Sequence, residues 1–153
     1  MKYESYLVTF TEVPDEISLC FNITGCPCHC EGCFEPWLRE DTGTPLTQAV
    51  LEALIDAHPH ITCVCFLGGD GRYAEMAELI KAVKVKYPKL KWAMYSGIPG
   101  LVEVVGRYLD YYKIGPYMPE FGPLNSKTTN QKFFKKENGD WVDITSVFQK
   151  EKI

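Results

Sequence analysis

Residues 25–34 read GCPCHCEGCF and hold four of the seven cysteines of this 153-residue chain. Three of the four, Cys26, Cys30 and Cys33, have the spacing C-x3-C-x2-C. Thiolates this close in sequence can converge on one centre, and thiolate ligands select zinc or iron–sulfur clusters. Three ligands are one short of a closed four-cysteine site. If the centre is an iron–sulfur cubane, one iron is therefore left open for a substrate.

The cysteine stretch follows two expected β-strands. Residues 3–11 alternate loosely, residues 12–15 form a turn, and residues 17–24 (ISLCFNIT) are rich in β-formers. We interpret these segments as two strands that form a hairpin. The stretch is then a loop at the carboxyl end of a strand, which is the edge where open α/β sheets bind ligands.

Downstream of the cysteines, the apolar periodicity alternates between helix and strand. Helices are expected over 45–57, 74–87 and 99–109, and strands over 61–67, 90–95 and 111–114. This order predicts parallel strands joined by right-handed crossovers. The chain has too few units for a full eight-fold barrel of about 250 residues. We therefore expect an α/β fold of the partial, open parallel β/α barrel type.

The C-terminal part of the chain has a different pattern. Residues 118–127 contain two prolines and a glycine and are expected to be irregular. Residues 132–144 are expected to form a β-hairpin with Asn138 and Gly139 at its turn. A weak helix is expected from Thr145 onward.

The length and the apolar share of 46% fit one domain of ordinary size. No repeat, low-complexity stretch or linker divides the sequence. We expect a single domain over residues 1–153, with a core at about 17–117 and a C-terminal extension at about 118–153.

Charge and cysteine usage limit the classes of partner. The net charge of −4 at pH 7 argues against direct nucleic-acid binding. No apolar run approaches the ~18 residues of a membrane span, and the N-terminus lacks a signal-peptide pattern. Seven cysteines without an export signal favour a reducing cytosol, where metal or redox chemistry is more usual than disulfides. We expect a cytoplasmic protein without a membrane partner.

The cysteine spacing, with aromatic Phe34 directly after it, resembles the radical S-adenosylmethionine (SAM) signature. Three further segments resemble that family in the same order along the chain. They are Gly68-Gly69-Asp70, similar to its glycine-glycine-acid motif, Ile114-Gly115-Pro116-Tyr117, similar to Asp-Gly-Pro-Phe, and Thr128-Thr129-Asn130-Gln131, similar to Ser-Ser-Asn-Gln. With the chain length, these segments resemble the activating proteins of anaerobic (class III) ribonucleoside-triphosphate reductase over residues 17–134.

The resemblance implies a [4Fe–4S] cluster on Cys26, Cys30 and Cys33, with SAM bound at the fourth iron. The SAM contacts that it implies are Gly32, Cys33, Phe34, Gly68, Gly69, Asp70 and Ser96, and candidate contacts to the partner or the cofactor are Asn130 and Gln131. The acid of the glycine-glycine-acid motif would hold the methionine amino group. No catalytic residue beyond the cluster and SAM is implied.

The resemblance also implies a reaction and two partners. A low-potential electron cleaves SAM to methionine and a 5′-deoxyadenosyl radical, and iron–sulfur potentials reach about −700 mV. The radical abstracts a hydrogen from a glycine Cα on the glycyl radical subunit of the reductase. The electron donor would be a protein such as flavodoxin or ferredoxin.

The sequence departs from the family pattern at several positions. Gly71 and Arg72 follow Asp70 where the family usually has proline, and Asp70 is one methylene shorter than the usual glutamate. Phe34 replaces the more usual tyrosine. Cys28 is an additional thiol whose role is open. A glycine pair before an acid also fits a plain strand-to-helix turn.

Two alternatives stay open from the sequence. The protein could activate another glycyl-radical enzyme or be a small radical SAM cyclase. It could also be a non-catalytic zinc-binding module, with Cys28 or His29 completing a four-ligand site. The remaining cysteines, Cys20, Cys63 and Cys65, are expected to be core residues that behave as small hydrophobes.

Overall fold

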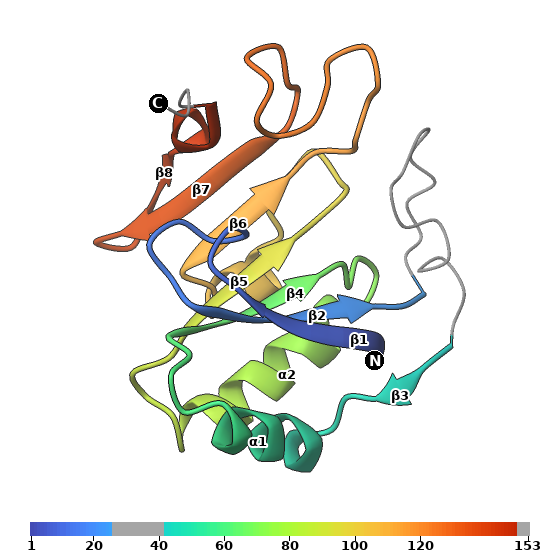
Figure 1. The fold of residues 1–153 in the computed structure, drawn as a ribbon, viewed down its shortest axis with the longest axis vertical. Coiled ribbons are helices and arrows are strands. Elements are labelled where there is room, and N and C mark those ends of the chain that lie inside the picture. Colours follow the sequence, from blue (N-terminus) through green and yellow to red (C-terminus); the bar gives the residue numbers. More distant parts are fainter. Residues whose placement is uncertain (26–41, 150–153) are drawn as a thin grey trace.

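The computed structural model describes residues 1–25 and 42–149, and within these ranges eight strands form one open sheet (Figure 1). The strand order is β3-β1-β2-β4-β5-β6-β7-β8. The strands are β1 (Lys2–Thr9), β2 (Ser18–Ile23), β3 (Thr44–Pro45), β4 (Cys63–Leu67), β5 (Lys91–Tyr95), β6 (Tyr111–Ile114), β7 (Lys132–Glu137) and β8 (Asp140–Asp143). The helices are α1 (Gln48–Ala57), α2 (Tyr73–Lys84), α3 (Glu103–Gly106) and the 3-10 helix η2 (Thr145–Gln149).

The centre of the sheet is parallel and its flanks are antiparallel. Strands β2, β4, β5 and β6 run parallel to one another. Strand β1 pairs antiparallel with β2, which confirms the expected hairpin, and β7 and β8 continue the sheet antiparallel beyond β6. The α/β class and the parallel centre are therefore confirmed. The described strands form a mixed open sheet and do not close into a barrel.

The two faces of the sheet carry separate apolar layers. On one face, α1, α2 and α3 pack against side chains such as Phe66 and Trp92, whose ring centroids lie 6.2 Å apart. We call the opposite face the inner face. Its buried layer is smaller and includes Val13 from the connection between β1 and β2. The tail contributes Phe133, whose ring centroid lies 4.9 Å from that of Phe148 in η2.

Local sequence signals account for several element boundaries. The Thr47 hydroxyl accepts a hydrogen bond from the Val50 N–H at 3.2 Å, so a standard N-cap begins α1. Between β7 and β8, Asn138 and Gly139 have φ values of 52° and 83°. Two successive positive φ values define the turn type that Asn-Gly favours, so the expected hairpin is confirmed.

Three expectations about elements were wrong. The helix expected over 99–109 is limited to α3, because residues 97–102 form bends and loop around Pro99 and Gly100 instead of a first turn. The strand β3 was not expected, since proline at its end favoured a helix start. The helix expected after residue 144 is the short 3-10 helix η2. Among the described residues, none of the helices has the length and apolarity to cross a membrane.

Candidate functional site

Four consecutive parallel strands end at one edge of the sheet, which we call the carboxyl edge. The segments that follow them begin at Thr24, Gly68, Ser96 and Gly115. The cysteine stretch begins at Gly25, two residues after the end of β2 at Ile23. The predicted site residues Cys26, Cys30, Gly32, Cys33 and Phe34 lie outside the described residues, and their assignments stay predictions.

Glycine is required at the first two positions after β4. Gly68 and Gly69 have φ values of 110° and 104°, a region that L side chains rarely adopt. A Cβ on Gly69 would lie 2.4 Å from Cε of Met76, and one on Gly68 would lie 3.2 Å from the carbonyl oxygen of Ile23. The pair therefore brings the loop close to the end of β2, where the cysteine stretch begins.

The third residue of the motif, Asp70, is 2% exposed and accepts hydrogen bonds from two neighbouring elements. Its Oδ1 accepts from the hydroxyls of Tyr73 and Ser96, both at 2.6 Å, and its Oδ2 accepts from the Gly97 N–H at 2.7 Å. A buried carboxylate is stable only when such donors replace water. Asp70 thus fixes the loop after β5 to the loop after β4. The role predicted for it at the cofactor amine stays a prediction.

Tyr73 is a site neighbour that the sequence analysis missed. It lies in the first turn of α2, three residues after Asp70, so its hydroxyl reaches back to that carboxylate. Burial raises the pKa of the Tyr73 phenol, and the hydrogen bond to Asp70 raises it further. The phenol therefore stays a neutral donor across the physiological pH range. The sequence did contain a signal for this contact, because a tyrosine stands three residues after an acid at the start of an expected helix.

Lys113, at the end of β6, is a second residue that the sequence analysis missed. It is buried, and its Nζ donates to the carbonyl oxygens of Ser96 at 3.3 Å and Gly115 at 2.9 Å. The same Nζ lies 5.9 Å from the ring centroid of Tyr95. The only signal in the sequence was a charged residue in the otherwise uncharged run YYKI, which does not identify its partners. Lys113 ties the loop after β5 to the loop after β6, as Asp70 ties the loops after β4 and β5.

Asn22 lies in the same row of the inner face as Lys113. The strand register places Asn22, Leu67, Tyr95 and Lys113 side by side across β2, β4, β5 and β6. The Asn22 Nδ2 donates to the hydroxyl of Ser5 at 2.8 Å. Its Oδ1 is buried and has no hydrogen-bond partner among the described residues. This acceptor lies just below the carboxyl edge.

The two candidate residues from the tail lie beside the loop that follows β6. The Asn130 Nδ2 donates to the Pro116 carbonyl oxygen at 2.9 Å, and Gln131 Nε2 donates to that of Gly115 at 3.5 Å. The Asn130 Oδ1, like that of Asn22, is buried without a partner within residues 1–25 and 42–149. The tail is therefore brought to the carboxyl edge, where its amides cap backbone carbonyls.

The three cysteines outside the cysteine stretch are buried in the inner face. Cys20, Cys63 and Cys65 are 0% exposed, as expected for core residues. Burial raises the pKa of the Cys63 and Cys65 thiols, so they stay protonated and are poor metal ligands. Within the described ranges, no group of three or more His, Cys, Asp or Glu side chains is arranged to hold a metal ion.

Comparison with known protein families assigns the chain to a class. The family described as a 4Fe-4S single cluster domain matches residues 17–101, more than half of the chain, and the chain belongs to this family. It is therefore an iron–sulfur protein with a [4Fe–4S] cluster. The match covers the cysteine stretch and the Gly68-Gly69-Asp70 loop but ends before β6. No curated protein and no solved structure matches the chain.

Proposed function

We propose that this iron–sulfur protein is a radical SAM activase that installs a glycyl radical on anaerobic ribonucleoside-triphosphate reductase. The observation that carries the proposal is the three-cysteine spacing in a chain of the single-cluster family. A cluster with three protein thiolates keeps one iron for an exogenous ligand. The glycine pair and the buried acid at the same edge support SAM as that ligand.

The donor set of the chain fits both groups. Cys26, Cys30 and Cys33 supply the soft thiolates that a [4Fe–4S] cluster needs. SAM carries an ammonium group and two ribose hydroxyls, which all donate hydrogen bonds. The buried acceptor oxygens of Asn22 and Asn130, which have no partner among the described residues, suit a ligand with such donors. When bound, the cluster and SAM supply a 5′-deoxyadenosyl radical that can take a hydrogen from a glycine Cα.

The described residues hold the loops of this edge in fixed positions. Asp70 joins the loops after β4 and β5, and Lys113 joins the loops after β5 and β6. A site that is fixed before the substrate binds loses less entropy on reaching the reactive geometry. These two buried charges therefore act as positioning residues for the backbone that faces the cofactor.

The packing of the inner face excludes water from beneath the edge. Val13 is fully buried in the same apolar cluster as Cys65 and Ala93, and the Tyr95 hydroxyl donates to the Glu12 carbonyl oxygen. On the inner face, apolar side chains rather than solvent therefore cover the strands next to the row that contains Asn22 and Lys113. A closed floor keeps solutes with weak C–H or S–H bonds away from a reactive carbon radical, so it favours hydrogen transfer from the intended glycine.

The test is product analysis with the anaerobically reconstituted full chain. With a chemical reductant and SAM, we expect methionine and 5′-deoxyadenosine, detected by mass spectrometry. Adding the reductase with its C-terminal glycine loop should give a glycyl radical signal in electron paramagnetic resonance. The Cys28→Ala variant is the matched control and should keep both activities, whereas Cys30→Ala should lose both.

The outcomes separate the two levels of the proposal. A cluster-loaded protein that never cleaves SAM would contradict radical SAM chemistry. Cleavage of SAM without a glycyl radical on the reductase, but with one on another glycyl-radical enzyme, would keep the chemistry and change the partner.

A further inference from the structure

Asn22 is a buried polar residue on the inner face of β2. All six residues of β2 are buried, and Asn22 itself is 7% exposed. Leu19, Phe21 and Ile23 pack in the layer under the helices, whereas Cys20 packs in the inner layer. Because side chains alternate along a strand, Asn22 lies on the inner face with Cys20. A side-chain amide in this position needs hydrogen-bond partners to offset the loss of water.

Only one half of the Asn22 amide has a partner among the described residues. Its Nδ2 donates to the Ser5 hydroxyl of β1 at 2.8 Å, and its Oδ1 is buried without a donor within residues 1–25 and 42–149. The residue beside it in the row is Leu67, whose apolar side chain cannot donate. Buried acceptors without a donor are rare in native proteins, because they weaken the fold. The bond to Ser5 also fixes the amide, so Oδ1 is held in one orientation.

Asp70, the acid of the glycine-glycine-acid motif, is already engaged by the protein. It is 2% exposed, and its two oxygens accept hydrogen bonds from Tyr73, Ser96 and Gly97 at 2.6 to 2.7 Å. A ligand amino group at this carboxylate would compete with those three donors. The carboxylate therefore serves the loops, and an amino group at this edge is better served by an acceptor that has no donor.

We propose that Asn22 Oδ1 accepts a hydrogen bond from the methionine amino group of SAM, the role that was expected for Asp70. This inference rests on the proposed function. The amino group donates hydrogen bonds whether it is protonated or bound to iron, and such a bond is strong where water is excluded. The amide oxygen is neutral, so it provides an acceptor without a second buried charge beside Asp70. Asn22 is thereby a specificity residue for the amino-acid end of SAM.

The position of Asn22 selects the amino group from among the donors of SAM. Asn22 lies on the strand that leads into the cysteine stretch, four residues before Cys26. The amino and carboxylate groups are the ones that can chelate an open iron, so this end of SAM belongs beside β2.

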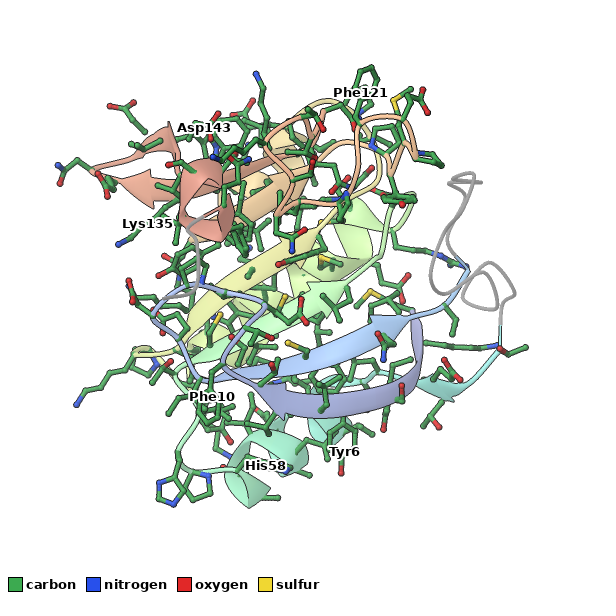
Figure 2. The ribbon with its side chains drawn as sticks, turned by 45° about the horizontal axis from the view of Figure 1, so that its top comes forward. Tyr6, Phe10, His58, Phe121, Lys135 and Asp143 are labelled. Atoms are coloured by element: carbon green, nitrogen blue, oxygen red, sulfur yellow. The ribbon has the colours of Figure 1, made fainter. Side chains whose placement is uncertain are left out.

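The second buried oxygen without a partner in the described part of the chain lies elsewhere. It is the Oδ1 of Asn130, beside the loop after β6. Strands β2 and β6 are three strand spacings apart, which is about 14 Å. Figure 2 shows Tyr6 of β1 and Phe121 of the tail on opposite sides of the molecule. Asn130 is therefore placed for the adenosine end of the ligand rather than for its amino group.

The test is equilibrium binding of two ligands that are not cleaved, measured by anaerobic dialysis with the reconstituted full chain. One is S-adenosylhomocysteine, and the other is the same molecule with a hydrogen in place of the amino group. The wild type should prefer the first, through both the iron and Asn22. Asn22→Leu should reduce this preference at least about ten-fold, by weakening the binding of S-adenosylhomocysteine alone. The iron is present in both proteins, so the change in preference reports on Asn22.

Two further variants serve as controls. Asn130→Leu makes the same substitution at the other amide and should keep the wild-type preference for the amino group. Asn22→Asp keeps an acceptor at the same place and should also keep the preference, whereas an amide that donated to the ligand carboxylate would lose affinity for both ligands. Iron content and thermal unfolding show that each variant keeps its cluster and its fold. Asn22→Ala takes the place of Asn22→Leu if the larger side chain unfolds the protein.

The outcomes separate this inference from the proposed function. An Asn22→Leu protein that keeps the wild-type preference would overturn the inference and leave radical SAM chemistry in place. An Asn22→Asp protein that loses the preference with its fold and cluster intact would do the same. A cluster-loaded wild type that binds neither ligand and never cleaves SAM would overturn the proposed function, and this inference with it.

Discussion

The seven cysteines of the chain fall into two regions for which we expect opposite chemistry. Four lie within residues 26–33, shortly after β2. The match to the single-cluster family, over residues 17–101, includes them. Three lie in β2 and β4, alternate with residues of the helix face, and are buried in the inner face. The same side chain is suited to bind a metal where thiolates can gather, and it behaves as a small hydrophobe where burial keeps it protonated. Spacing along the chain, rather than the number of cysteines, distinguishes the two.

The largest expected effect is the loss of the cluster from a variant of the first region. Cys30→Ala removes one of the three proposed thiolate ligands, so iron should fall from about four per chain to near zero. Cys63→Ala is the comparison from the second region and should keep its full iron content. Iron and sulfide analysis after anaerobic reconstitution measures both. Equal iron loss in the two variants would break the distinction between the regions.

The next effect concerns the carboxyl edge itself. Asp70→Ala leaves the hydroxyls of Tyr73 and Ser96 and the Gly97 N–H without their acceptor, and should destabilise the fold by about 2–4 kcal/mol. Urea unfolding followed by circular dichroism gives the difference. Asp140→Ala, at an exposed position of the β7–β8 hairpin, should change stability by no more than about 0.5 kcal/mol. A similarly small change for Asp70→Ala would show that its network is dispensable.

A smaller effect is expected in the buried cysteine region. Cys65→Ser places a hydroxyl among apolar neighbours and should cost about 1–2 kcal/mol of unfolding free energy, with iron content unchanged. Cys28→Ser serves as its partner variant in the cysteine stretch. Denaturant unfolding of the two proteins under reducing conditions makes the comparison. Loss of iron from Cys65→Ser with full stability would assign the inner-face thiols to the metal centre instead.

The smallest expected effect is a dependence of folding stability on pH that arises from Glu12. Burial raises the pKa of Glu12 above its ordinary value of 4.5, because the charged form is desolvated. Stability therefore falls as the pH rises from 4.5 through the raised value. Glu12→Gln should unfold at a higher temperature than the wild type at pH 8, and this gain should vanish near pH 4. Melting curves of both proteins from pH 4 to pH 8 make the comparison. A wild type that melts at a higher temperature than Glu12→Gln at pH 8 would show that the fold stabilises the charged form of Glu12.

The sequence predicted the parts of the fold that periodicity controls. The runs ITCVCFL and LKWAMY and the amphipathic helices α1 and α2 are long enough for their period to identify them. Prediction from periodicity failed at α3, where Pro99 and Gly100 delay the start of the helix. It also failed at β3, where two residues pair with β1 only because the tertiary fold brings them together. A two-residue strand has no period to read.

The candidate site was predictable where a spacing encodes it and not where tertiary contacts create it. Gly68, Gly69 and Asp70 were identified by their order after a buried strand. Lys113 was not, because its role depends on carbonyl oxygens of two loops that meet only in the folded sheet. The tail was expected as a C-terminal extension of the same domain. The sequence did not show that β7 pairs with β6 and carries Gln131 to the carboxyl edge.

The central claim is that three cysteines hold a cluster with one iron open to SAM. The most direct test is electron paramagnetic resonance of the reduced, anaerobically reconstituted protein, recorded with and without SAM. We predict a reduced [4Fe–4S] signal whose g values shift when SAM is added. A cluster signal that is identical in both samples, or a protein that binds zinc and no sulfide, would contradict the account.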